Sequence, residues 1–170
     1  TAPIVNGTAI FELGNNVTAG DHNITVVYNG DENYNNVTKK DNITVTKGTI
    51  SPDDVKVNIT DSTYGNVTIE VTVPEDATGN VTITIEGKDY TAPIVNGTAI
   101  FELGNNVTVG EHNITIVYNG DENYNNVTKN DTITVKITID PDDVKVNVTN
   151  STYGNVTIKV TVPEDATGNV

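Results

Sequence analysis

The chain has 170 residues and a formal net charge of −14, and it lacks Cys, which excludes disulfides and thiolate metal sites. Nine Lys and no Arg cannot supply the basic patch that nucleic acid or an anionic membrane surface requires. No apolar run approaches the roughly 20 residues that are needed to span a bilayer. Only two Phe are present, so the core must consist mainly of Val and Ile.

Alternating apolar and polar residues predict β-strands, because successive side chains of a strand point to opposite faces. In the stretch NVTIEVTV at 66–73, every Val and Ile falls on one face and every polar residue on the other. Turn phrases such as PEDATGN and NGDEN separate the alternating stretches, and none has a helical period. The expected strands are 55–59, 66–73, 81–85, 99–103, 113–118 and 131–136.

Six or seven short strands without helices predict an antiparallel β-sandwich of two sheets around one aliphatic core. Pro93 should mark an edge or crossing strand, because proline cannot donate to the ladder of a central strand. Tyr118 should lay its ring over the core, with its hydroxyl near the surface.

The sequence repeats itself with a period of about 90 residues. Residues 1–39 match 91–129 with three differences, and 52–81 match 141–170 with three more. Because the offset falls from 90 to 89, one residue is lost near the junction. We expect a fragment of a longer tandem array, with the C-terminal part of one unit at 1–47, a complete unit at 48–136 and the N-terminal part of the next at 137–170.

The order of phrases within the unit points to a family. ATGNVTI precedes a central strand, GTAIFEL follows, and GEHNITIVYNGDENY comes next, all within 73–135. This run resembles the bacterial immunoglobulin-like repeats of long surface adhesins, and adhesin-like proteins of methanogenic archaea carry similar repeats rich in Asn and Thr. The resemblance implies an Ig-like sandwich in a stalk or filament, outside the cell or on its surface, and it brings no catalytic motif.

Sixteen Asn residues stand in Asn-X-Thr triplets without Pro at X, roughly three times the number that a random order of the same residues would give. Strand alternation explains part of this excess, since Asn-Val-Thr reads polar, apolar, polar, and codon bias is a further alternative. Asn is nevertheless a poor strand former, so we predict N-glycosylation of many of these sites. The acceptors are Asn6, Asn16, Asn23, Asn36, Asn42, Asn58, Asn66, Asn80, Asn96, Asn106, Asn113, Asn126, Asn130, Asn147, Asn150 and Asn155.

These features predict a structural, non-enzymatic module of a glycosylated stalk, adhesin or filament, whose partners are copies of itself and covalent N-glycans. If separate subunits end as this chain does, 137–170 of one could complete 1–47 of another, head to tail. The alternative is an adhesive domain that binds a glycan or a protein through loops containing Tyr34 and Tyr124.

Few residues suggest other chemistry. His22 and His112 are expected to be lone turn residues, and no Ser has a partner base, so no catalytic residue is predicted. No cofactor is expected, although the acidic pairs Asp53-Asp54 and Asp121-Glu122 could lie near the ends of a domain and bind calcium.

Overall fold

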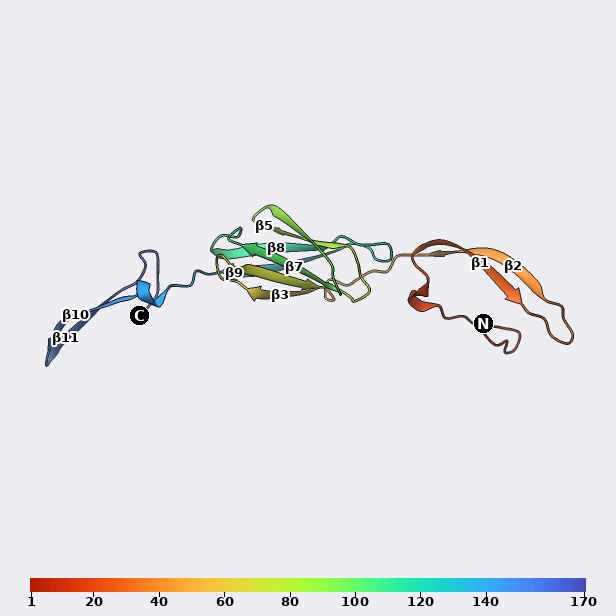
Figure 1. The fold of residues 1–170 in the computed structure, drawn as a ribbon, viewed down its shortest axis with the longest axis horizontal. Helices are drawn as coiled ribbons and strands as arrows, with labels where there is room; N and C mark the ends of the chain where they lie inside the picture. The colour runs from red at the N-terminus through yellow and green to blue at the C-terminus, as the bar shows by residue number, and fades with distance from the viewer.

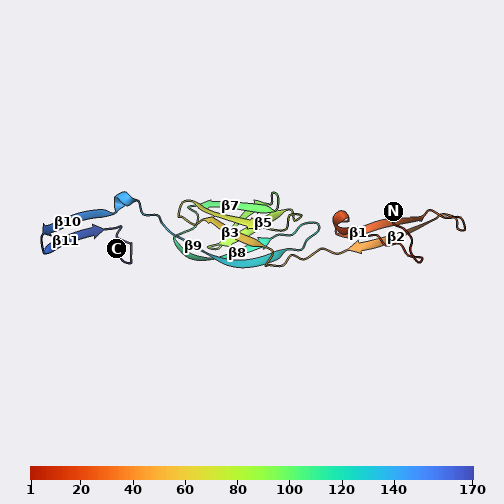
Figure 2. The ribbon, with the colours of Figure 1, turned by 90° about the horizontal axis from the view of Figure 1, so that it is seen from below.

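The computed structural model describes residues 1–170, whose regular secondary structure consists of β-strands and two short 3-10 helices. A sandwich of two sheets lies in the middle of an elongated molecule, with a two-stranded hairpin beyond each end of it (Figure 1). The same row of three parts is visible after a turn of 90° (Figure 2). The predicted all-β fold class is confirmed.

The central sandwich has a three-stranded and a four-stranded sheet, and all hydrogen-bonded neighbours in both are antiparallel. The first sheet has the order β3-β4-β7 and consists of Lys56–Asp61, Val67–Thr72 and Thr98–Gly104. The second has the order β6-β5-β8-β9 and consists of Lys88–Pro93, Asn80–Ile85, Gly110–Tyr118 and Val127–Val135. Because β4 pairs with β7, the chain passes to the other sheet and back between them, as sandwiches of this kind do.

All six expected strands are present, with shifted ends. The seventh, β6, was expected only as an edge or crossing strand at Pro93 and was given no bounds, because its first four residues, Lys-Asp-Tyr-Thr, are mostly polar. It is an edge strand, and Pro93 is its last residue, so the prediction of an edge at Pro93 is confirmed.

The prediction for the Tyr118 hydroxyl is wrong. Tyr118 faces inward on β8, in line with Ile114 and Ile116, and its whole side chain is buried. The hydroxyl has no hydrogen-bond partner, and burial raises its pKa above the usual value for tyrosine. The ring therefore lies within the core rather than over it.

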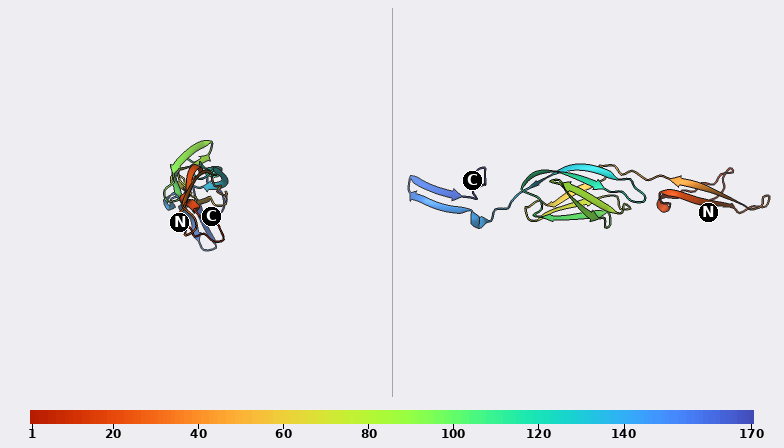
Figure 3. Two further views of the ribbon diagram at one scale, coloured as in Figure 1. Left: turned by 90° about the vertical axis from the view of Figure 1, so that its right-hand side faces the viewer. Right: turned by 90° about the horizontal axis from the view of Figure 1, so that it is seen from above.

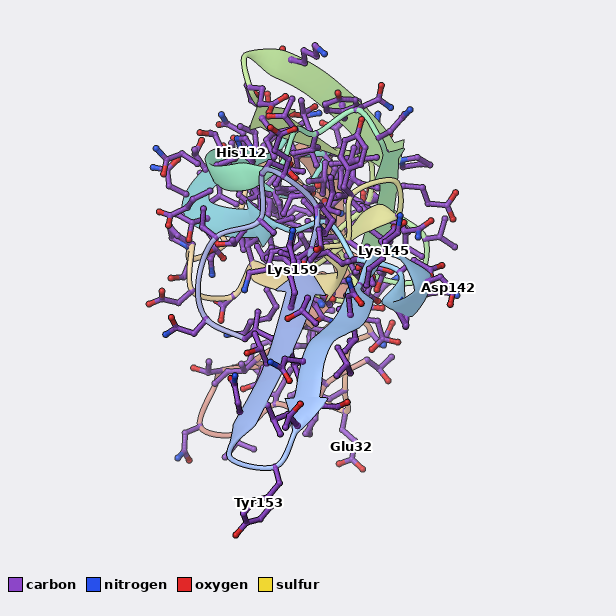
Figure 4. All side chains as sticks on the ribbon, turned by 90° about the vertical axis from the view of Figure 1, so that its left-hand side faces the viewer. Glu32, His112, Asp142, Lys145, Tyr153 and Lys159 are labelled. Atoms are coloured by element: carbon purple, nitrogen blue, oxygen red, sulfur yellow. The ribbon has the colours of Figure 1, made fainter.

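Two hairpins flank the sandwich at the ends of the long axis (Figure 3). In the first, β1 pairs with β2 after the turn η1, and in the second β10 pairs with β11 after η2. Tyr153, at the tip of the second hairpin, points away from the rest of the molecule (Figure 4). The bounds are Gly14–Asn16 for η1, Gly20–Tyr28 for β1, Val37–Val45 for β2, Pro141–Asp143 for η2, Lys145–Thr152 for β10 and Asn155–Thr161 for β11.

The core lies entirely in the sandwich. All 21 buried apolar residues fall between Ile50 and Val135, and they form one cluster. Phe101 is 4% exposed, whereas Phe11, at the same place in the repeated sequence, is 54% exposed. The same apolar sequence is thus buried where two sheets face each other and exposed where a hairpin stands alone.

Candidate functional site

The predicted acceptor residues lie on the outer surface. Fifteen of the sixteen Asn side chains are exposed, and Asn150 is half-buried. Most stand on strands or at the residue before one, as Asn113 does on β8 and Asn66 does before β4. Asn6 and Asn96 instead occupy Asn-Gly turns with φ of 51° at both positions. The side chains that a glycosyl transferase would modify therefore project into solvent.

The middle residue of the triplet points the other way in the sandwich. Val67, Val81 and Ile114 are buried in the core between an outward Asn and an outward Thr. This follows from the two-residue period of a strand, which places Asn and Thr on the same face. Asp131 departs from this pattern, because it is the exposed middle residue of the triplet at Asn130.

Three of the sixteen acceptor amides are already engaged as hydrogen-bond donors. The Nδ2 atoms of Asn16 and Asn106 each donate to a backbone carbonyl at 2.8 Å, and that of Asn58 donates to Glu70 at 3.5 Å. No intramolecular bond engages the amide nitrogens of the other acceptors, which leaves them free to be modified.

The triplet at Asn106 is also held by its Thr. The backbone N–H of Thr108 donates to Glu86 Oε1 at 3.0 Å, and its hydroxyl donates to the same oxygen. The hydrogen bonds from Thr108, with a weaker contribution from His112, lower the pKa of Glu86. His112 Nδ1 lies 3.4 Å from Glu86 Oε1. These contacts of Glu86 join the β5–β6 turn to the start of β8. They were not predicted from the sequence.

Acceptors on paired strands lie close together. Asn23 on β1 is directly opposite Asn42 on β2. In the sandwich, Asn113 instead faces Thr132, while Asn130 faces Thr115 and accepts a hydrogen bond from its hydroxyl at 3.1 Å. The two units thus arrange their acceptors differently on the same outer face.

Asp121 organises the loop that follows β8. Its Oδ1 accepts the backbone N–H groups of Asn123 and Tyr124 at 2.7 Å, and its Oδ2 accepts the N–H and the hydroxyl of Thr78 at 2.8 Å. Partial burial opposes ionisation, but these hydrogen bonds outweigh it and lower the pKa of Asp121 to about 2. The carboxylate therefore joins the end of β8 to the segment that enters β5.

The equivalent loop in the first hairpin has the same hydrogen bonds within the loop, but no residue there takes the place of Thr78. Asp31 Oδ1 accepts the N–H groups of Asn33 and Tyr34 at 2.7 and 2.8 Å. Its Oδ2 accepts the Tyr28 hydroxyl at 2.6 Å instead, and this bond is the main cause of its lowered pKa. Sequence reasoning did not give Asp31 or Asp121 this role, although Asp after Asn-Gly is a turn signal.

The two Tyr residues proposed as ligand contacts differ in exposure. Tyr34 is 70% exposed. Tyr124 is half-buried, because its ring lies against Gly48 and its hydroxyl donates to Asp76 Oδ2 at 2.8 Å. The structure does not bring Tyr34 and Tyr124 together, because they belong to loops of different units.

The remaining candidates do not form a cluster. His22 and His112 lie in β1 and β8, so the expectation of turn residues is wrong, and each Nε2 is within 2.8 Å of a Thr carbonyl four residues earlier. No three His, Asp or Glu side chains come close enough together to hold a metal ion. Asp53-Asp54 are exposed, and calcium binding there or at Asp121-Glu122 remains only an alternative to the expectation of no cofactor.

Comparison with known proteins supports the class that the fold defines, a sandwich of the immunoglobulin type. Residues 55–138 match the family model described as "Bacterial Ig-like domain (group 3)". The comparison with curated proteins gave no match. The match to the family model supports an Ig-like fold for the central sandwich, which is similar to bacterial Ig-like domains. A methanogen origin stays a prediction.

The match to this family suggests a surface-associated structural or adhesive module. Domains of the family are commonly extracellular and typically non-catalytic. The structure contains no apolar helix of the length needed to cross a membrane.

The variant Asp121→Asn should destabilise the sandwich by about 1–3 kcal/mol at neutral pH, because one acceptor oxygen becomes a donor. The pKa of Asp121 is about 4 in the unfolded chain and about 2 in the folded one. The contribution of its carboxylate to stability is therefore fully present above about pH 4 and is lost as the pH falls through about 2. Thermal melts at several pH values should therefore show the difference between wild type and variant shrinking over that range.

The matched control is Asp31→Asn, which changes the same loop outside the sandwich and should leave the main transition unchanged. A difference between wild type and Asp121→Asn that stays constant down to pH 2 would contradict the assigned role.

Proposed function

We propose that the chain is a structural module of a glycosylated cell-surface stalk, adhesin or extracellular filament. The observation that carries this proposal is the placement of the acceptor triplets, with Asn and Thr outside and the middle residue of most sandwich triplets in the core. A solvent-facing strand needs only polar side chains, and Thr, Lys or Glu would form it at lower cost than Asn. The excess of Asn is best explained by a chemical use of its amide.

The glycans would act physically. The sandwich has open edges at β3, β6, β7 and β9, and unpaired edge strands invite pairing with other chains. Acceptors stand on β3 and β9 themselves, at Asn58 and Asn130. Sugars at these places would cover the edges, and with the net charge of −14 they would keep neighbouring stalks apart.

Near-identical units favour a spacer over a binding protein. Domains joined end to end add length with each copy while every unit keeps its own core. The elongated arrangement of the three parts is consistent with this role (Figure 3).

The proposal extends to how units are completed. An isolated two-stranded hairpin is marginally stable in water, and both outer hairpins expose apolar faces. Ile158 is 57% exposed on β11, whereas its counterpart Ile69 is fully buried on β4. We propose that strands of another unit cover these faces. If separate subunits end as this chain does, 137–170 of one copy would complete 1–47 of the next.

The sandwich provides the template for this pairing. Segments equivalent to 137–170 supply β3 and β4, and segments equivalent to 1–47 supply β7, β8 and β9. Thr167, the counterpart of Thr78, would then donate to Asp31 in place of the Tyr28 hydroxyl. Only the counterpart of 82–90 is missing, so the three-stranded sheet would be complete and the other would keep β8 and β9.

Mass spectrometry of peptides from native material tests the first proposal. We expect sugar on acceptors whose side-chain amide and triplet Thr hydroxyl have no competing hydrogen bond, such as Asn23 and Asn126. If transfer follows folding, occupancy should be lower at Asn106. Native peptides that carry no sugar at any acceptor would overturn it.

Light scattering of the 170-residue chain tests the completion of units. The mass should rise with protein concentration, and Ile158→Lys should prevent this because it places a charge in the new core. Thr161→Lys, which adds the same charge on the outer face of β11, is the control and should assemble normally. A wild-type chain that stays monomeric, or equal behaviour of the two variants, would contradict strand completion.

A further inference from the structure

The loop 121–126 of the sandwich contacts the segment that links it to the preceding hairpin. Gly48 forms a parallel bridge with Tyr124. Its N–H donates to the Asn123 carbonyl at 2.8 Å, and its carbonyl accepts the Asn125 N–H at 3.0 Å. The linker is thus added to the loop as a short strand, a recognised mode of peptide binding.

The contact extends beyond the linker into the hairpin unit. Asn123 Oδ1 accepts the N–H of Ala19 at 2.9 Å, and Asn15 Nδ2 donates to Asp76 Oδ2 at 3.1 Å. Asp76 is also the acceptor for Tyr124, so one carboxylate bonds to both units. These bonds join the sandwich to the loops at the near end of the first hairpin unit.

Close packing, rather than backbone conformation, explains the glycine at position 48. Gly48 does not have a positive φ, so its backbone would accept other residues. A Cβ added there would lie 3.1 Å from two ring carbons of Tyr124, which is closer than an ordinary contact. A branched side chain needs more room than the ring leaves, so the ring or the linker would have to shift, and a shift of the linker would weaken the bridge.

The second linker of the chain does not have this glycine. Counting back from the matching residues Ile50 and Ile139, Ile137 stands in place of Gly48. The linker from Val135 to Ile139 is also one residue shorter than that from Val45 to Ile50. The two junctions of this chain therefore differ at the residue on which the docking depends.

The loop alone does not bury its Tyr. The loop 31–36 has the same sequence and the same hydrogen bonds to Oδ1 of its Asp, yet Tyr34 is 70% exposed. Burial of Tyr124 thus comes from what is docked on the loop, the linker with Gly48, and from Asp76.

We propose that the loop 121–126 is a docking site for the linker of the preceding unit, and that the residue at position 48 decides whether two neighbouring units are held in a fixed arrangement. A glycine there gives a docked joint, and a branched residue, as at Ile137, gives an undocked one. This goes beyond the spacer function and does not depend on glycosylation. If the chain is a spacer, its stiffness would be set joint by joint through the linker sequence.

Amide hydrogen exchange of the 170-residue chain, followed by NMR, tests this docking. In the wild type, the amides of Ala19 and Asn125 should exchange slowly, because each donates across the joint. In Gly48→Ile, both should exchange about tenfold faster or more, while core amides such as that of Ile116 stay protected.

Two further variants separate docking from a general loss of stability. Asn123→Ala should speed exchange at Ala19, because it removes the acceptor oxygen of that bond, and Asn33→Ala, the same change in the unoccupied loop, should not. Unchanged exchange at Ala19 and Asn125 in Gly48→Ile would overturn the proposal, as would equal effects of Asn123→Ala and Asn33→Ala. A loss of glycosylation or of assembly would not alter either outcome.

Discussion

The rest of the structure depends on one constraint: the apolar side chains of a strand are buried only where a second sheet packs against its sheet. Each hairpin of this chain can satisfy its own backbone hydrogen bonds, but it covers neither of its faces. In the sandwich, β4 and β8 bring Ile69 and Ile116 into one dry cluster, and burial of such side chains is the main favourable contribution to folding. The outer hairpins have nearly the same sequence, but their apolar side chains remain exposed. Burial here is therefore determined by the presence of the opposite sheet and not by the local sequence alone.

The same constraint links the fold to the proposed modification. Because Val67 and Val81 must point inward, the Asn before each and the Thr after each must point outward. An Asn-X-Thr triplet in a strand thus has the outward, inward, outward order of side chains that the strand itself has. A domain with such triplets in its strands therefore presents their Asn amides on its surface. The turn acceptor Asn106 shows the limit of this rule, since hydrogen bonds to Leu103 and, through Thr108, to Glu86 hold its triplet.

The strands could be predicted from the sequence because alternation is local, and the edge at Pro93 because proline lacks an N–H. The extent of that edge strand, β6, could not be predicted, because its edge position lets it carry polar residues on both faces. The buried hydroxyl of Tyr118, the bond from Thr78 to Asp121 and the packing of Gly48 on Tyr124 also escaped prediction, since the last two join residues 43 and more positions apart. Such contacts depend on how strands are stacked, which no local pattern encodes. The outward position of the acceptors followed from the sequence, whereas the engagement of Asn106 did not.

Chemical denaturation of the dilute, monomeric chain tests most directly whether the opposite sheet decides burial. Ile69→Ala should lower the free energy of unfolding of the sandwich by about 2–5 kcal/mol, because it leaves a cavity in the core. Ile158→Ala removes the same side chain from nearly the same sequence, where Ile158 is 57% exposed, and should leave the transition unchanged. Equal losses from the two variants, or no loss from Ile69→Ala, would contradict the account.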